Sequence, residues 1–194
     1  MPTGVAIRDV RERLFDAAER VLLRDGPSEL TSRAVTSEAG CAKGVLHRHF
    51  TDFDTFLVEL VLDRIRGLDA QGRALRDSAG TGAVVDNLTT ALGTVFESVA
   101  VEILGLVTSR HELLARLRRT TPTGIPVLAE VTAMLASYLA IERELGRVAA
   151  VADVDALAPM LVGTGHLLFA GQRDAPPTPE AVRKVVAAAL AGIV

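Results

Sequence analysis

The sequence predicts an all-α protein. Apolar residues recur every three or four places along most of the chain, which is the spacing of amphipathic helices. No stretch of useful length alternates between apolar and polar residues as a half-buried strand would. With 194 residues, of which 49% are hydrophobic, the chain can bury a sizeable core. We expect an N-terminal three-helix unit that contains a helix-turn-helix, joined by a long helix to a larger helical domain.

The first expected helix runs from Ile7 to Asp25 and ends at Gly26 and Pro27. Its apolar stripe is predicted to cover the inner face of the helix-turn-helix. Three basic side chains of this helix are expected to face water, and they are Arg8, Arg11 and Arg13.

Residues 30–50 read as a helix-turn-helix. Thr31 can cap a short first helix, and Gly40 supplies the left-handed conformation that a sharp turn needs. A second short helix is predicted from about Ala42 to His49, with Leu46 and Phe50 facing inward at a spacing of four. On spacing alone, any helical hairpin remains an alternative interpretation.

The outward face of that second helix is suited to a DNA major groove. Lys43 and Arg48 can reach phosphates or base edges, Gly44 allows close approach, and Val45 can touch a thymine methyl group. Between residues 31 and 50, three cations (Arg33, Lys43 and Arg48) stand against Glu38, which leaves a charge of plus two before the histidines are counted.

The rest of the chain is expected to be helical. Asp52 can cap a long connecting helix that runs to about Arg76, and residues 78–82 form a loop. Further helices are predicted at about 83–100, 101–119 with a break near Ser109, 125–146, 153–171 and 178–193, the last two capped by Asp153 and Thr178. The predicted domains are 1–51 (helix-turn-helix), 52–76 (connecting helix) and 77–194 (ligand binding and dimerisation).

The helix at 153–171 is apolar on more than one side, so more than its own subunit's core is expected to bury it. Gly163 and Gly165 permit another helix to approach closely. A monomer with an unusually buried central helix is the alternative.

Over residues 7–62 the pattern resembles the DNA-binding signature of the tetracycline-repressor-like (TetR) family of bacterial transcription regulators. The residues that carry the resemblance are Thr31, Arg33, Val35, Ala39, Gly40, Lys43, Gly44, Leu46, His49 and Phe50. Four positions depart from the family: Cys41 replaces Val, Ala42 replaces a capping Ser, His47 replaces Tyr, and Phe53 replaces Lys. In the family that Tyr and that Lys touch phosphate, so two backbone contacts are altered here.

The resemblance implies a ligand-responsive regulator, by default a repressor, that binds a near-palindromic double-stranded operator as a homodimer. The DNA-binding residues it implies are Thr31, Arg33, Lys43, Gly44, Val45, His47 and Arg48. The last two helices are expected to pair across a twofold axis through Leu157, Leu161, Gly165, Leu168, Val182, Val186 and Leu190. A small hydrophobic effector is expected in a cavity near Phe96, Glu102, Met134, Tyr138 and His166. The alternative is a helical small-molecule binding protein whose specific DNA binding is weakened or lost.

Other function classes find no support. No phosphate-binding loop or nucleophile elbow is present, so we expect no enzyme activity and no cofactor. His47 and His49 point to different sides of a helix, Glu142 and Glu144 are expected on solvated faces, and no metal site follows. The single Cys41 excludes an internal disulfide. The charges in the N-terminal segment argue against an export signal, and no membrane span is expected, so a cytoplasmic protein is predicted. The net charge of −3 argues against a protein that coats nucleic acid without specificity.

Overall fold

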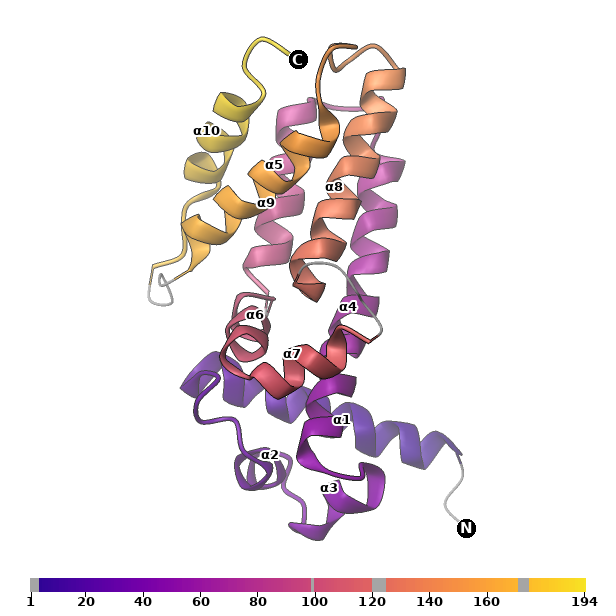
Figure 1. The fold of residues 1–194 in the computed structure, drawn as a ribbon, viewed down its shortest axis with the longest axis vertical. Helices are drawn as coiled ribbons and strands as arrows, with labels where there is room; N and C mark the ends of the chain where they lie inside the picture. The colour runs from indigo at the N-terminus through magenta and orange to yellow at the C-terminus, as the bar shows by residue number, and fades with distance from the viewer. Residues whose placement is uncertain (1–3, 99, 120–124, 171–174) are drawn as a thin grey trace. The chain divides into compact units, whose positions relative to one another are not determined.

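The computed structural model describes residues 4–98, 100–119, 125–170 and 175–194, with side chains from residue 9 onward. The described residues form helices and contain no strand, so the predicted all-α class is confirmed (Figure 1). The helices are α1 (Gly4–Asp25), α2 (Ser32–Glu38), α3 (Gly44–His49), α4 (Phe53–Asp77), α5 (Val84–Phe96), α6 (Ala100–Ser109), α7 (His111–Leu117), α8 (Pro126–Glu144), α9 (Val154–Phe169) and α10 (Pro179–Ala189).

The chain folds into two compact units. Unit 1 comprises residues 1–63 and 102–125, and unit 2 comprises residues 64–101 and 126–194. Residues 102–119, which include α7 and most of α6, thus belong to the same unit as the N-terminal helices. Helix α4 begins in unit 1 and continues into unit 2.

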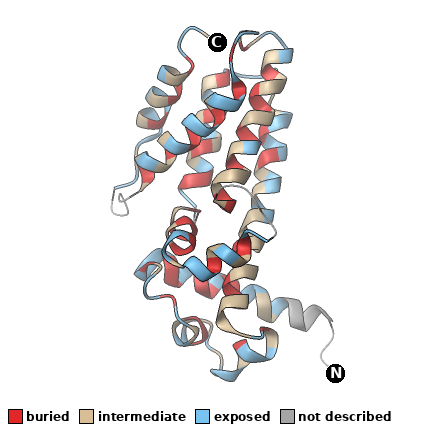
Figure 2. Ribbon diagram, in the orientation of Figure 1, coloured by how far each residue is buried: buried red, intermediate tan, exposed pale blue. Residues whose placement is uncertain are grey.

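In unit 1, α1 packs against α2, and α2 meets α3 at the turn. The centre of the unit is aromatic: the rings of Phe15 and Phe56 lie 5.6 Å apart, and Phe50 meets Phe56 edge-on at 5.0 Å. Helix α6 approaches the end of α1 closely, since a Cβ placed on Gly105 would lie 3.3 Å from Pro27 Cγ. The buried residues of α1 and α6 complete this core (Figure 2).

In unit 2, α9 packs against α8 and α5, and α10 covers α5 and α9. The contact between α9 and α5 depends on Gly165, because a Cβ at this position would lie 2.6 Å from Phe96 Cε2. Gly163 and Gly165 were both expected to allow another helix to approach. Gly165 allows the approach of α5, which belongs to the same chain. A Cβ on Gly163 would meet nothing within 4 Å.

The four predicted N-caps are confirmed. In each case the side chain accepts a hydrogen bond from the backbone N–H three residues later: Thr31 from Ala34 (3.1 Å), Asp52 from Thr55 (2.6 Å), Asp153 from Ala156 (3.1 Å) and Thr178 from Ala181 (3.3 Å). These bonds place the starts of α2, α4, α9 and α10 where the sequence predicts them.

Several predicted boundaries shift. Helix α3 begins at Gly44 rather than Ala42, and α10 ends at Ala189 rather than near residue 193. The break expected near Ser109 is confirmed: α6 ends at Ser109, and Arg110 is extended before α7 begins. Among the described residues, no single helix is long and apolar enough to cross a membrane, and only the bent pair α5 and α6 passes that test by length and composition.

Candidate nucleic-acid interface

The turn between α2 and α3 is built around Gly40, whose φ of 62° lies in the left-handed region. Just beyond it, the Cys41 N–H donates to the Thr36 carbonyl at 3.0 Å, which closes the end of α2. The Thr36 hydroxyl is itself buried and donates to the Ser32 carbonyl at 2.9 Å. These local bonds set the direction in which α3 leaves the turn.

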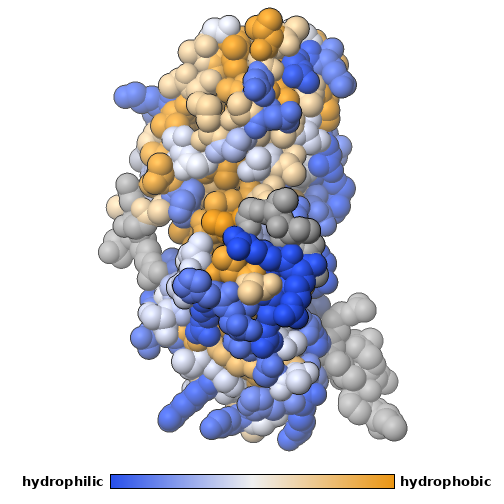
Figure 3. Space-filling view, viewed as in Figure 1, coloured by the Kyte–Doolittle hydropathy of each residue, from blue (hydrophilic) through white to orange (hydrophobic). Residues whose placement is uncertain are grey.

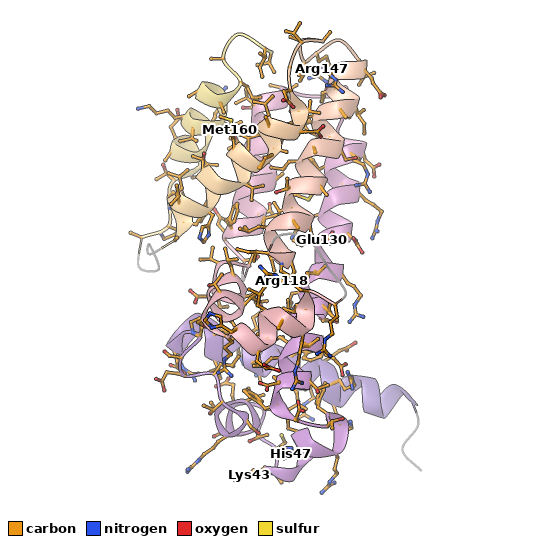
Figure 4. All side chains as sticks on the ribbon, viewed as in Figure 1. Lys43, His47, Arg118, Glu130, Arg147 and Met160 are labelled. Carbon is orange, nitrogen blue, oxygen red and sulfur yellow. The ribbon has the colours of Figure 1, made fainter. Side chains whose placement is uncertain are left out.

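Helix α3 has a buried face and an exposed face. Leu46 is fully buried and Phe50 nearly so, which anchors the helix to unit 1. Four of the predicted DNA-binding residues of this segment are exposed, and they are Lys43, Gly44, His47 and Arg48. Val45 is half-buried, and Thr31 and Arg33 at the start of α2 are exposed. Figure 4 shows Lys43 and His47 together at one end of unit 1, and Figure 3 shows that this end is mostly hydrophilic.

Glu38, the acidic residue of the helix-turn-helix, is paired with two arginines of α1. Glu38 accepts hydrogen bonds of 2.8 Å from Arg20 Nε and from Arg24 Nη1, both on α1. These two guanidinium groups hold the pKa of Glu38 below its usual range. The carboxylate is therefore ionised and already paired at neutral pH, so it does not cancel the positive charge of Lys43 and Arg48.

The positions that depart from the family pattern have structural consequences. Lys43 occupies the N-cap position of α3 and makes no side-chain capping bond, while Ala42 contributes only its carbonyl, which accepts from the Val45 N–H at 2.9 Å. Phe53 stacks on Phe56 with 5.6 Å between ring centroids, and the Arg110 guanidinium lies 5.9 Å from its ring. The first side chain of α4 is therefore part of an aromatic cluster instead of a cation.

The expectation that Arg11 faces water is wrong. Its guanidinium donates to the His49 carbonyl at 3.1 Å, lies 4.3 Å from the centroid of the Phe50 ring and forms an ion pair with Glu59. Arg11 thus joins α1 to the end of α3. Arg13 is exposed and donates to the Ala39 carbonyl at 3.2 Å, whereas the side chain of Arg8 lies outside the described residues.

Residues 14–60 match the family model described as bacterial regulatory proteins, tetR family. The match begins in α1 and ends within α4, so it includes the whole helix-turn-helix. Residues 14–60 therefore form a DNA-binding domain of the TetR family of transcriptional regulators, which is not a family of enzymes.

Several solved structures share the fold across nearly the whole chain. A TetR-family member from Streptomyces coelicolor is 24% identical, with 93% of this chain and 97% of that chain covered and a TM-score of 0.64. The fatty acid degradation regulator FadR from Bacillus halodurans is 20% identical, with 94% and 95% covered and a TM-score of 0.70. The multidrug binding protein EbrR, complexed with imidazole, is 21% identical, with 95% and 96% covered and a TM-score of 0.61. None of the curated proteins compared with the chain matches it.

The residues predicted for a TetR effector site do not all lie together. The rings of Phe96 and His166 lie 6.3 Å apart in unit 2. Met134 instead lines a cavity of about 180 Å³ between α4 and α8, whose wall includes the charged residues Asp69, Arg73, Arg76 and Glu130. Tyr138 is fully buried and hydrogen-bonded, and Glu102 belongs to unit 1.

The residues predicted for the TetR dimer interface divide into two groups. Leu157 and Leu168 are half-buried. The other five are buried within a single subunit, where they face its own core, and they are Leu161, Gly165, Val182, Val186 and Leu190. The large apolar side chains that α9 exposes are Met160 and Leu167, with 57% and 76% of their surface accessible. Helix α9 is apolar on two sides, as predicted. The outward stripe of α9, formed by Met160 and Leu167, lies beside the residues predicted for the dimer interface.

Sequence reasoning missed a buried polar cluster at one end of unit 2. Glu142, which was expected on a solvated face, is fully buried. Its Oε1 accepts from the Tyr138 hydroxyl at 2.6 Å and from the Gly80 N–H at 3.3 Å, and its Oε2 lies 3.4 Å from Arg147 Nη1. The spacing of four between Tyr138 and Glu142 on one helix was the available signal. Glu144 is exposed, as expected.

Proposed function

We propose that this regulator is a repressor that binds a near-palindromic operator as a homodimer and is released by a hydrophobic small molecule. The observation that carries the proposal is the exposed cationic edge of α3, where Lys43, His47 and Arg48 are accessible while Leu46 anchors the opposite face. The cytoplasmic location expected from the sequence is part of the same proposal.

In this proposal α3 lies in the major groove. Arg48 and Lys43 contact phosphates or base edges, and an arginine can pair with guanine through two hydrogen bonds. Gly44 admits the DNA backbone because a Cβ there would meet nothing within 4 Å. His47 donates to phosphate in place of the family's Tyr, and Val45 contacts a thymine methyl group. Thr31 and Arg33, at the exposed start of α2, contact the neighbouring phosphates.

The homodimer is proposed to form through α9 and α10. Met160 and Leu167 lie seven residues apart, so they stand on the same side of α9, and both are more than half exposed. Exposed apolar stripes of this kind mark protein interaction surfaces. Figure 4 shows Met160 on α9, and on α10 the half-buried Val185 and the exposed Ala188 offer further small apolar side chains. A twofold pair of subunits explains why the operator should be near-palindromic.

The effector is proposed to bind near the aromatic residues shared by α5 and α9. The Phe96 and Phe169 rings stack with 5.8 Å between centroids, and His166 lies beside them. His166 Nδ1 is shielded from solvent and has no hydrogen-bond partner among the described residues, so it can bond to a ligand. EbrR, which shares the fold, is a multidrug binding protein, and this supports a small-molecule ligand here.

Selection of DNA from random fragments with the purified protein tests the proposal. We expect the enriched fragments to share a near-palindromic sequence. Lys43→Ala and Arg48→Ala should each weaken binding to that sequence by about tenfold or more, because each removes a contact to base or phosphate. Arg73→Ala, which removes an exposed arginine from the unit 2 part of α4, should leave the affinity unchanged. Equal losses in all three variants would contradict the proposed interface.

Two observations at the same edge of unit 1 favour a second function, that of a small-molecule binding protein. The N-cap residue of α3 makes no side-chain capping bond, and the side chain of Phe53 cannot contact phosphate as a cation. Both would suit a ligand-binding protein in which specific DNA recognition has weakened. Affinity measured against salt separates the two functions: a specific regulator keeps a large preference for one sequence over random DNA, whereas the weakened protein shows salt-sensitive binding without preference.

A further inference from the structure

Two carboxylates follow the recognition helix α3 directly. Asp52 is the last residue before α4, and Asp54 lies in the first turn of that helix. Both side chains are partly exposed, Asp52 at 49% and Asp54 at 41%. Asp52 is four residues from Arg48, so their Cα atoms are at most about 14 Å apart. The major groove is only about 12 Å wide. When α3 occupies the groove, these carboxylates therefore come close to the phosphates that line it.

The surroundings of Asp52 favour its charged form. The Thr55 N–H and hydroxyl, with the nearby Arg116 guanidinium, hold the pKa of Asp52 below its usual range. Asp54 adds a second carboxylate in the first turn of α4. Two uncompensated negative charges at this edge would repel DNA.

Arg116 of α7 reaches both carboxylates. Its Nη1 lies 3.4 Å from Asp52 Oδ1 and its Nη2 lies 3.7 Å from Asp54 Oδ2. Glu112, on the same helix, is a weaker competitor, because it lies 3.9 Å from Arg116 Nε and its side chain is 73% exposed. Arg116 is 64 residues from Asp52 in the sequence, yet both belong to unit 1.

The position of α7 is fixed independently of these charges. Arg110, just before the helix, donates from Nη2 to the Leu30 carbonyl at 3.0 Å, and its guanidinium lies over the Phe53 ring. Leu113 and Leu117 are buried. The Arg116 guanidinium is therefore presented to the start of α4 by a helix that is packed into the same unit.

We infer that Arg116 is a positioning residue for DNA binding, which acts by neutralising Asp52 and Asp54 where they would otherwise repel the phosphates. With Arg116 in place, the three groups carry a net charge of minus one, and without it they carry minus two. The affinity of the N-terminal helices for DNA thus depends on a side chain from the middle of the chain.

Binding of a fluorescein-labelled, mixed-sequence duplex tests this inference, since non-specific affinity needs neither a known operator nor an effector. At about 0.05 M salt, Arg116→Gln should weaken binding by about two- to fivefold, and Asp54→Asn should strengthen it. The double variant Arg116→Gln with Asp54→Asn should return to near the wild-type affinity. Asp54 is suited to this rescue because the capping bond of α4 comes from Asp52. At about 0.2 M salt the effect of Arg116→Gln should shrink.

Arg118→Gln is the matched control. It removes the same charge from an exposed arginine next to the end of α7, and Figure 4 places Arg118 away from Lys43 and His47. Its effect should be clearly smaller than that of Arg116→Gln. Equal losses in the two variants, or a loss in Arg116→Gln that Asp54→Asn fails to relieve, would overturn the inference. If the wild-type chain binds no duplex at any salt concentration, both the inference and DNA binding itself fail.

Discussion

The Tyr138 hydroxyl donates a 2.6 Å hydrogen bond to Glu142 Oε1, and both side chains are fully buried within unit 2. Asn87 Nδ2 donates to the same hydroxyl at 2.9 Å and to the Thr81 carbonyl at 2.9 Å. Arg147 contacts the second Glu142 oxygen and also donates to the Gly82 carbonyl. The cluster thereby ties the loop between α4 and α5 to the end of α8.

Raising the pH should destabilise the fold through Tyr138. Burial raises the pKa of its hydroxyl well above the usual value, and the hydrogen bond to Glu142 adds to this. In the unfolded chain the group ionises near pH 10, whereas in the folded chain it keeps its proton to higher pH. Its contribution to the unfolding free energy is therefore constant below about pH 10 and falls above it.

The near-ultraviolet absorbance of tyrosinate measures this directly, because Tyr138 is the only tyrosine among the 194 residues. Ionisation should coincide with loss of helical circular dichroism, and Tyr138→Phe should remove this part of the alkaline destabilisation. Formation of tyrosinate near pH 10 in a chain that is still fully helical would contradict the prediction.

Tyr138→Phe should also lower stability at neutral pH. It removes a hydrogen-bond donor from a buried carboxylate, which should cost about 1–3 kcal/mol of unfolding free energy. Denaturant unfolding at one protein concentration provides the measurement. The control is Glu144→Gln, at an exposed position near the end of the same helix. It should change the free energy by less than about 0.5 kcal/mol. Similar values for the two variants would show that the cluster contributes no stability.

Gly165→Ala should disturb the packing of α9 on α5. The added Cβ would lie 2.6 Å from Phe96 Cε2 and 3.3 Å from Leu92 Cδ2, so the helices or the ring must move. Overpacking of this kind costs about 1–3 kcal/mol. The control is Gly67→Ala on α4, where a Cβ would meet nothing within 4 Å. There the helix should gain up to about 1 kcal/mol. Thermal or denaturant unfolding should therefore shift in opposite directions for the two variants.

Charge on the outward stripe of α9 should dissociate the proposed dimer. Met160→Glu and Leu167→Glu each place a carboxylate among apolar side chains that a partner would cover, so sedimentation should show a shift towards monomers. Val151→Glu changes an apolar side chain that is 91% exposed in the loop before α9, and it should sediment like the wild type. Unchanged association in both α9 variants would place the subunit contact elsewhere.

The sequence alone predicted the features that depend on near neighbours along the chain. The caps at Thr31, Asp52, Asp153 and Thr178 each accept from an N–H only three residues away, and the left-handed turn at Gly40 needs only the glycine itself. The burial of Leu46 and the exposure of Lys43 follow from the period of one helix. For this reason the all-α class, the helix-turn-helix and the outward cationic edge could be predicted from local pattern.

Only the tertiary structure decided which distant segments share a unit and which face of α9 the chain itself covers. Arg110 donates to a carbonyl 80 residues away, and Arg116 reaches carboxylates more than 60 residues away, so no local pattern places α7 beside the helix-turn-helix. Glutamate is usually found at the surface, but Glu142 is buried, where Tyr138 and Gly80 donate to one carboxylate oxygen and Arg147 forms an ion pair with the other. An apolar stripe predicts that a face is buried, but the identity of the covering partner depends on packing over the whole chain.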